Sequence, residues 1–273
     1  MPHGYFISGG WGFTIPQPPK SLASSYPIRN YDRPFKLSVH ITHWAADHRT
    51  AFLKRQIEAL NDIEAAVDVF VHTNVDRLDV RHAHNVVEHE ISEEYCHFLS
   101  WKHKALMVEQ LPHYDAFLYL EDDILFGNQN LNYWFKNHEV LRAHDCYAGF
   151  VRYESDGTAN YATDITPVFG QCTPLPRISL GGSEYWENTN NFYNGCWILD
   201  NVEMQKFVKL PQWDLTKCDF YGNFIREKPA IGPIPFYDKV LLDLDDLGCY
   251  VHHMPNNYIG HDVFCKSKLA SLK

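Results

Sequence analysis

The stretch of sequence that decides the fold is AFLYLEDDILF, residues 116–126. Five apolar residues lead into Glu121, Asp122 and Asp123, and a second apolar run follows them directly. Three adjacent carboxylates cannot lie beside a dry core unless a cation compensates their charge. Carboxylate oxygens at this density suit a hard divalent ion such as Mg²⁺ or Mn²⁺. The alternative is an acidic surface turn, which the apolar residues on both sides of the triplet disfavour.

The residues before the acids predict strands that alternate with helices. Leu37, Val39 and Ile41 alternate with polar residues, as in a strand, and Asp47 is a suitable N-cap for the helix that follows. We expect strands over 36–44, 67–72 and 115–126 and helices over 47–61 and 99–111. This alternation is typical of an α/β fold with a Rossmann-like, mixed and mostly parallel sheet flanked by helices. Ligands of such sheets bind beyond the carboxyl ends of the strands.

The second half of the chain is less regular, and we expect it to complete the same domain. Elements are predicted at 131–144 (helix), 146–153 (strand), 192–199 (strand), 202–209 (helix), 215–227 (helix) and 239–247. Residues 1–35, rich in Gly, Pro and Ser, read as an irregular arm. The prediction is therefore one catalytic domain over 36–273, with a nucleotide-binding half over 36–145 and an acceptor-binding half over 146–273.

Composition restricts the class of partner. The 24 Lys and Arg residues are outnumbered by 34 Asp and Glu residues, which gives a net charge of −10. This balance argues against a nucleic-acid partner, because such binding needs clustered cations. The seven Cys are an odd number without a Cys-x-x-Cys pair, so a reducing compartment fits best. The N-terminus does not read as a signal peptide, and no run approaches the roughly 18 apolar residues of a membrane helix.

The acid triplet resembles the Asp-x-Asp motif of GT-A-fold, metal-dependent nucleotide-sugar glycosyltransferases, in a Glu-Asp-Asp form. The resemblance implies a GT-A-like fold and a donor that is a nucleoside-diphosphate sugar, with UDP favoured over GDP by family frequency. It implies that Asp123 binds Mn²⁺ or Mg²⁺ and that Asp122 contacts the ribose or the ion. Glu121 is expected at the same nucleotide-sugar site.

Other segments follow the same plan. The strand that ends at Thr42 and the helix that carries Arg49 resemble the nucleotide-binding opening of the family, and both residues are candidates for the base and ribose. Asn74, after the second strand, occupies the place where an Asn or Asp often reads uracil. Lys104 occupies the place of a basic residue that faces the nucleotide. For Arg49, Asn74 and Lys104, an ordinary surface or turn role stays open.

The acceptor side is predicted from three later segments. Gly195 and Trp197 resemble the acceptor-side strand, where glycine permits close approach and an aromatic ring stacks on a sugar. A plain core strand with a bulge is the equal alternative for this segment. Asp219 resembles the acid that deprotonates the acceptor hydroxyl in inverting members, although Cys218 stands where the exostosin-like and N-acetylglucosaminyltransferase branches carry a preceding acid. A simple helix cap is the alternative for Asp219. His261 is the first choice for a late ligand of the metal or diphosphate, and His253 is the second; an ordinary surface histidine is the alternative for either.

Three other functions remain as alternatives. A nucleotidyltransferase that makes nucleotide sugars would need a Gly-rich loop after the first strand, but residues 42–47 read THWAAD. A non-catalytic carbohydrate-binding protein would use the aromatic residues and leave the acids without a role. A glycoside hydrolase needs its acids separated across a cleft, not consecutive.

The expected enzyme is thus a glycosyltransferase of the hexosyltransferase type. It would act on a hydroxyl of a glycan or glycoconjugate, in polysaccharide biosynthesis. We expect it in the cytoplasm, with a Golgi-lumen catalytic fragment as the alternative. A lipid-linked acceptor would bring it to a membrane surface. The particular sugar, the acceptor, the anomeric outcome and the oligomeric state do not follow from the sequence.

Overall fold

The chain divides into two compact units, each assembled from separate stretches of sequence. The first unit comprises Arg29–Asn128 and Gly195–Pro235, and the second comprises Met1–Ile28, Gln129–Asn194 and Phe236–Lys273. The computed structural model describes residues 33–78, 80, 85–163, 175–189, 193, 195–214, 229–230, 232–233 and 237–259, with the backbone of 13–14 and 268–270. The predicted division after residue 145 does not coincide with these units, because 195–235 returns to the first one.

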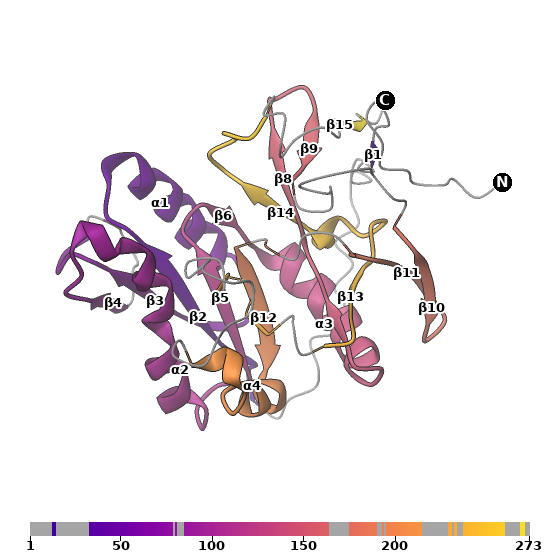
Figure 1. Cartoon of the computed structure of the whole chain (residues 1–273), viewed down its shortest axis with the longest axis horizontal. Helices are drawn as coiled ribbons and strands as arrows, with labels where there is room; N and C mark the ends of the chain where they lie inside the picture. Colours follow the sequence, from indigo (N-terminus) through magenta and orange to yellow (C-terminus); the bar gives the residue numbers. More distant parts are fainter. Residues whose placement is uncertain are drawn as a thin grey trace. The chain divides into compact units, whose positions relative to one another are not determined.

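A five-stranded sheet forms the centre of the first unit, in the order β12-β5-β2-β3-β4 (Figure 1). Its strands are β2 (Lys36–His43), β3 (Ala66–Thr73), β4 (Asn85–Glu88), β5 (Ala116–Glu121) and β12 (Cys196–Asp200). The first four run parallel, and β12 pairs antiparallel with β5. The predicted α/β fold with a mixed, mostly parallel sheet is confirmed for this unit.

Helices accompany this sheet: α1 (Asp47–Asn61), η1 (Glu93–Trp101), α2 (His103–Gln110), α4 (Asn201–Phe207) and η2 (Pro211–Trp213). The N-cap of α1 is Ala46, without a side-chain cap, so Asp47 lies in the first turn instead of capping it. The helix predicted over 99–111 is divided into a 3₁₀ segment and α2. The strand predicted over 115–126 is divided into β5 and β6 (Ile124–Leu125), since a turn starts at Asp122.

The two faces of β2 differ in chemistry, and this difference determines what each face contacts. Leu37, Val39 and Ile41 are fully buried and apolar, whereas Ser38 and His40, equally buried, point to the opposite face. β5 is apolar along its whole length up to the acids, as expected of a central parallel strand. The core of the first unit is therefore built on β2 and β5, and the acids stand where β5 ends.

Strands of the second unit belong to two further sheets. Strands β1 (Phe13–Thr14), β15 (Lys268–Ala270), β9 (Asn160–Ala162), β8 (Val151–Ser155) and β14 (Tyr250–His253) lie in one sheet. The other has β10 (Arg177–Leu180), β11 (Ser183–Glu187), β13 (Lys239–Leu242) and β7 (Cys146–Ala148). Helix α3 (Asn128–Arg142) and the 3₁₀ turn η4 (Leu247–Cys249) complete it. Within this unit, the Asn130 side chain of α3 donates to the carbonyls of Gly248 and Tyr250.

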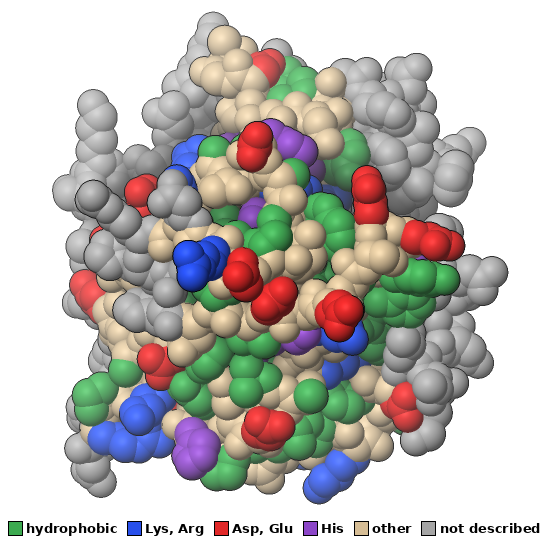
Figure 2. All heavy atoms as spheres, turned by 90° about the vertical axis from the view of Figure 1, so that its left-hand side faces the viewer, with side chains coloured by type: hydrophobic (Ala, Val, Ile, Leu, Met, Phe, Trp, Pro, Cys, Tyr) green, Lys and Arg blue, Asp and Glu red, His purple; other side chains and the backbone are tan. Residues whose placement is uncertain are grey.

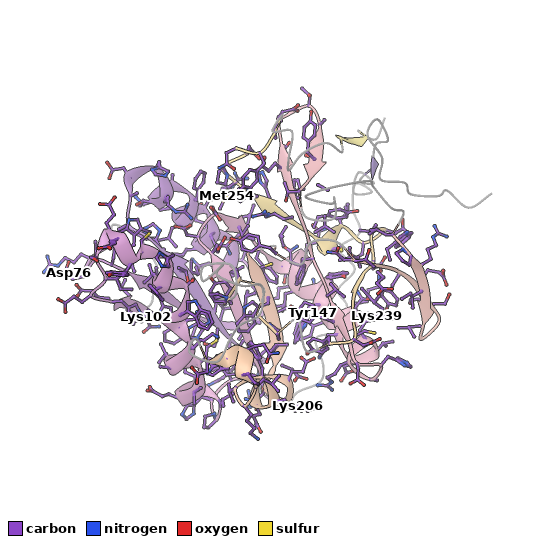
Figure 3. The ribbon with its side chains drawn as sticks, viewed as in Figure 1. Asp76, Lys102, Tyr147, Lys206, Lys239 and Met254 are labelled. Carbon is purple, nitrogen blue, oxygen red and sulfur yellow. The ribbon has the colours of Figure 1, made fainter. Side chains whose placement is uncertain are left out.

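Surface chemistry follows the composition. Acidic side chains recur over the face drawn in Figure 2, with basic ones interspersed. Asp76 and Lys102, labelled in Figure 3, are both exposed. Among the described residues, no helix has the length and apolar character needed to cross a membrane.

Candidate active site

The acid triplet lies at the carboxyl edge of the five-stranded sheet. The Glu121 amide donates to the Gly195 carbonyl at 2.8 Å, and the Asp122 amide donates to the Thr42 carbonyl at 3.2 Å. Thr42 and Glu121 are also register neighbours on β2 and β5. The fold therefore joins the predicted acids to the predicted residues of two other segments.

Asp122 is fully buried and is held by two side chains. The guanidinium of Arg49 donates through Nε to Oδ2 at 3.0 Å and through Nη2 to Oδ1. The Nδ1 atom of His43, which is also fully buried, lies 2.6 Å from the same Oδ2. Since both oxygens of Asp122 are engaged, its role is to hold this cluster together. The predicted direct contact of Asp122 with ribose or metal is not supported by this arrangement.

Arg49 is the cation that compensates the acids. Its Nη2 atom also lies 3.1 Å from Oδ2 of Asp123, so one guanidinium bridges two carboxylates. Burial by itself would lower the pKa of Arg49, but the carboxylates of Asp122, Asp123 and Glu121 outweigh burial and raise it. The sequence led us to expect a divalent metal as the compensating cation, and metal binding stays a prediction; for Asp122 and Asp123 the structure shows an arginine in that role. The structure supplies that cation from α1.

Asn74 stands at the same edge, immediately after β3. Its Oδ1 atom accepts a hydrogen bond from the Ala45 amide at 2.8 Å, and this contact fixes the loop between β2 and α1. That loop carries the chain from His43 to the first turn of α1, where Arg49 lies. Asn74 therefore positions the loop that brings Arg49 to the acids.

Gly195 adopts a left-handed conformation, with φ of +67°. A Cβ atom there would lie 2.9 Å from Cγ1 of Ile124 and 3.0 Å from Oε2 of Glu121. The close approach predicted for this glycine is therefore to the protein's own Glu121 and Ile124. Its carbonyl holds the Glu121 amide, so Gly195 shapes the acid turn from the side of β12.

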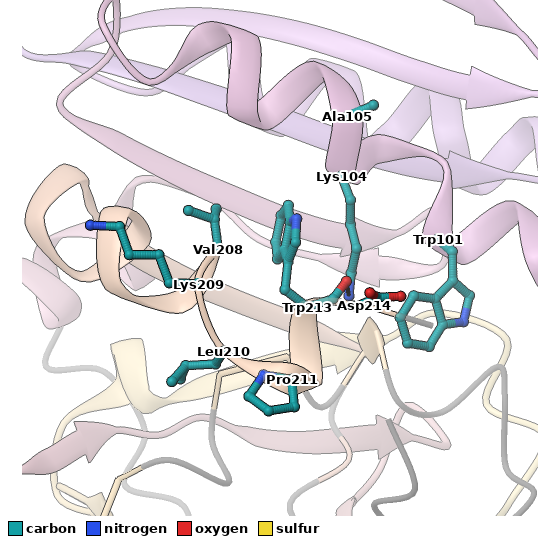
Figure 4. A pocket seen from close by; sticks show the side chains of 9 residues that line it. All are labelled: Trp101, Lys104, Ala105, Val208, Lys209, Leu210, Pro211, Trp213 and Asp214. Carbon is teal, nitrogen blue, oxygen red and sulfur yellow. Dashed lines mark hydrogen bonds between the residues drawn. The ribbon is translucent and has the colours of Figure 1, made fainter. Parts of the chain in front are cut away.

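Lys104 is buried away from the acids. Its Nζ donates to the carbonyls of Gln212 and Trp213 and lies 3.9 Å from the centroid of the Trp101 ring. It lines a pocket of about 550 Å³ formed by Trp101, Lys104, Ala105, Val208, Lys209, Leu210, Pro211, Trp213 and Asp214 (Figure 4). Two of its donors serve η2, and these contacts do not support the prediction that Lys104 faces the nucleotide.

Trp197 is part of the core. It is fully buried, its indole N–H donates to the Pro229 carbonyl at 2.7 Å, and it stacks on Tyr119. Gly232, with φ of +58°, packs so closely on the indole that a Cβ would lie 2.3 Å from it. The ring has no exposed face, which agrees with the alternative of a plain core strand, and a role for Trp197 as an acceptor platform is not supported by this packing.

Two predicted residues, Asp219 and His261, lie outside the described residues. His253, the alternative late ligand, lies in the second unit at the end of β14. Its Nδ1 atom is 2.6 Å from Oε1 of the fully buried Glu154 on β8, and its ring stacks on Tyr258. Oε2 of Glu154 accepts from the Tyr258 amide at 2.8 Å, so Glu154 ties β14 to the turn after it.

Histidines form a second polar cluster in the first unit. His40 Nδ1 lies 2.9 Å from His72 Nε2, and His72 Nδ1 lies 2.9 Å from His89 Nε2, so three rings make a hydrogen-bonded chain. At its inner end, Oε1 of Gln110 is 2.9 Å from His40 Nε2. Burial lowers the pKa of His40 to about 3. Burial is also the main cause that lowers the pKa of His72 to about 2, with smaller contributions from His40 and His89. These rings are therefore neutral at neutral pH.

Sequence reasoning missed His43, which is as much a part of the site as Arg49. Its Nδ1 holds Asp122, while its Nε2 is buried and has no hydrogen-bond partner among the described residues. The available signal was its place as the last residue of β2, one position beyond Thr42. Histidine at a strand end is common on surfaces, so only the pairing with Asp122 reveals its role.

No protein-family model matches this chain, and no curated protein matches it either. The chemistry of the described residues therefore carries the functional argument.

Proposed function

We propose that the protein is a glycosyltransferase that moves a sugar from a nucleoside-diphosphate sugar to a hydroxyl of a glycan or glycoconjugate. The observation that carries the proposal is the acid turn at the carboxyl end of β5, placed between β2 and the residue before β12. Ligands of open α/β sheets bind at this edge. The GT-A likeness itself rests on the acid motif, and the mixed, mostly parallel sheet is the coarser part of that expectation that this unit shows.

The residues of this edge suit a nucleoside diphosphate better than a neutral ligand. Arg49 is 30% exposed at its side chain, and its planar guanidinium can bind phosphate oxygens in pairs. Glu121 and Asp123 stand beside it with carboxylates that can accept hydroxyl groups or ligate a cation. UDP remains the preferred nucleotide on the resemblance alone.

The fit of a divalent cation depends on which carboxylate oxygens at the site could ligate it. Among the described residues, no three His, Cys, Asp or Glu side chains form a group that could hold a metal by themselves. Mg²⁺ commonly uses one or two carboxylates, with water and substrate phosphates as its other ligands. Glu121 and Asp123 fit that arrangement, and Asp122 does not. They would hold Mg²⁺ or Mn²⁺, which supplies Lewis-acid stabilisation of the departing diphosphate.

The chain's own residues would have separate roles in the transfer of the sugar. Arg49 binds the diphosphate and stabilises the negative charge that grows on it as the bond to the anomeric carbon breaks. Asp122 and His43 fix the guanidinium, and Asn74 fixes the loop before it. The acceptor hydroxyl attacks the anomeric carbon and gives its proton to a carboxylate, for which Asp219 stays the prediction if the configuration inverts.

The direct test is calorimetric titration with UDP and with GDP, each in the presence and absence of Mn²⁺. We expect metal-dependent binding of one nucleotide, and loss of turnover in Asp123→Ala with an unchanged circular dichroism spectrum. Exposed Asp76, changed to Ala, is the matched control. If neither nucleotide binds at any Mn²⁺ concentration, the proposal fails.

A non-catalytic carbohydrate-binding protein is the second candidate, and one observation favours it. The pocket of Figure 4 has two indole rings, Trp101 and Trp213, together with Lys209 and Asp214, a combination that can stack on a sugar and bind its hydroxyls. Glycan binding that needs neither nucleotide nor metal and is lost in Trp213→Ala would support this candidate.

A further inference from the structure

We infer that Arg49 competes with the divalent cation for Asp123, so that the cation binds well only together with the diphosphate of the donor. This inference rests on the proposed function and concerns the order and coupling of binding at the same site. It assigns to Arg49 a second role, as the residue that keeps the acid turn neutralised when the site is empty.

The contacts of the guanidinium carry the inference. One side chain bonds both oxygens of Asp122 through Nε and Nη2, and the same Nη2 lies 3.1 Å from Oδ2 of Asp123. Asp122 and His43 are fully buried, so their packing fixes the side of the guanidinium that faces Asp122. Asp123 is also nearly buried, with 8% of its side chain exposed, and water screens its pairing with Arg49 only weakly.

A divalent cation on Asp123 would lie close to this guanidinium. Mg²⁺ binds carboxylate oxygens at about 2.0–2.1 Å. The ion would therefore share a carboxylate with a fixed positive charge, and their repulsion in a poorly screened site weakens cation binding. For the cation to bind tightly, Arg49 must release Asp123 or gain another anion.

The diphosphate supplies that anion. Its oxygens accept paired hydrogen bonds from a guanidinium and also ligate the cation. When both bind, the two positive groups face added negative charge, so each ligand strengthens the binding of the other. The inferred result is a site that binds the metal tightly together with the nucleotide and only weakly in its absence.

The experiment measures the affinity of Mn²⁺ alone, from the electron paramagnetic resonance signal of free Mn²⁺, for the wild type and three variants. Arg49→Gln removes the charge. Arg49→Lys keeps a cation beside Asp122, which protects the fold, but a lysine cannot bridge two carboxylates as a fork. Arg55→Gln, on the exposed face of the same helix, makes the same charge change away from the site.

We expect Arg49→Gln to bind Mn²⁺ alone roughly tenfold more tightly than the wild type, because an adjacent charge at intermediate dielectric is worth at least that much. Arg49→Lys should show a smaller gain, and Arg55→Gln should stay within about twofold, since its charge is screened by solvent. In calorimetric titrations, the gain in Mn²⁺ affinity on adding UDP should shrink in both Arg49 variants.

The outcomes separate the inference from the proposed function. If the wild type binds UDP with Mn²⁺, but both Arg49 variants bind Mn²⁺ alone no more tightly than it does, the inference is wrong and the proposed function stands. If Arg49→Gln proves unfolded by circular dichroism, Arg49→Lys decides. Failure of the wild type to bind UDP or GDP with Mn²⁺ would instead overturn the proposed function.

Discussion

At the scale of single residues, Arg49 and Asp122 show how a buried charge is tolerated at the edge of a core. Asp122 has no exposed surface, yet two hydrogen-bonding side chains satisfy it. Breaking such a buried pair is costly, because the remaining partner keeps its charge without compensation.

The first prediction concerns this pair. Asp122→Asn should lower the free energy of unfolding by about 3 kcal/mol, because Arg49 and His43 lose a charged acceptor in a buried setting. Urea denaturation measures the change. Asp76→Asn is the control, since Asp76 is exposed and its loss should stay within about 0.5 kcal/mol. Equal effects of the two substitutions would contradict the structural role given to Asp122.

The second prediction concerns Gly195. Gly195→Ala places a Cβ at φ of +67° and against Ile124 and Glu121, so both backbone strain and crowding act. Gly157→Ala is the matched control, because its φ is +84° but nothing lies within 4 Å of its added Cβ. We expect a loss of about 1–2 kcal/mol in the control from strain alone, and a larger loss at Gly195. Similar losses at both positions would show that the acid turn does not need this close approach.

At the scale of elements, His40 joins the polar face of β2 to Gln110 of α2, to His72 of β3 and, through His72, to His89 after β4. His103, at the start of α2, is fully buried, and burial, together with His40, His72 and Lys104, keeps its pKa well below the ordinary value. Burial and Lys102 also lower the pKa of the half-buried His89. Rings that stay neutral when folded but take up protons when unfolded make stability depend on pH.

The third prediction follows from the direction of these pKa shifts. The folded pKa values of His40 and His72 are about 3 and about 2, below the ordinary 6.5. The unfolded chain therefore binds more protons below pH 6.5, and stability present above that pH is lost as the pH falls. With His40, His72 and His103, the loss should approach about 4 kcal/mol per pH unit below about pH 6.

Urea unfolding at a series of pH values between 7.5 and 5 measures this slope. His103→Phe removes one of the three buried titrating rings and should reduce the slope by about 1.4 kcal/mol per pH unit. Val202 is exposed and carries no titrating group, so Val202→Ala should leave the slope unchanged. A wild-type stability that is flat over this range would contradict the neutral histidine chain.

At the scale of the whole molecule, the net charge of −10 opposes an anionic ligand, so binding of a diphosphate depends on local groups. Acidic side chains recur on the face drawn in Figure 2. Arg49, together with a cation at Glu121 and Asp123, would make the local electrostatic potential positive at the carboxyl edge of the sheet.

The fourth prediction is measured on the full chain. A ligand that binds only the folded state adds about 2.7 kcal/mol of stability at a concentration of 100 times its Kd. UDP and Mn²⁺ together should therefore raise the midpoint of thermal unfolding, and each alone should raise it much less. Asp123→Ala should abolish the joint effect. A shift with Mn²⁺ alone equal to the joint shift would contradict the coupling between cation and nucleotide.

The sequence by itself determined the strands β2, β3 and β5 and the helix α1, because apolar periodicity and a buried strand that ends in acids depend on local order; it did not predict β4. It also determined that Glu121, Asp122 and Asp123 need a compensating cation. Only the tertiary structure decided that Arg49 and His43 hold Asp122, that Gly195 makes room for Glu121, and that Trp197 and Lys104 are buried elsewhere. These contacts form between segments that are far apart in the sequence. The pattern of neighbouring residues does not show which distant segments come into contact at the edge of the sheet.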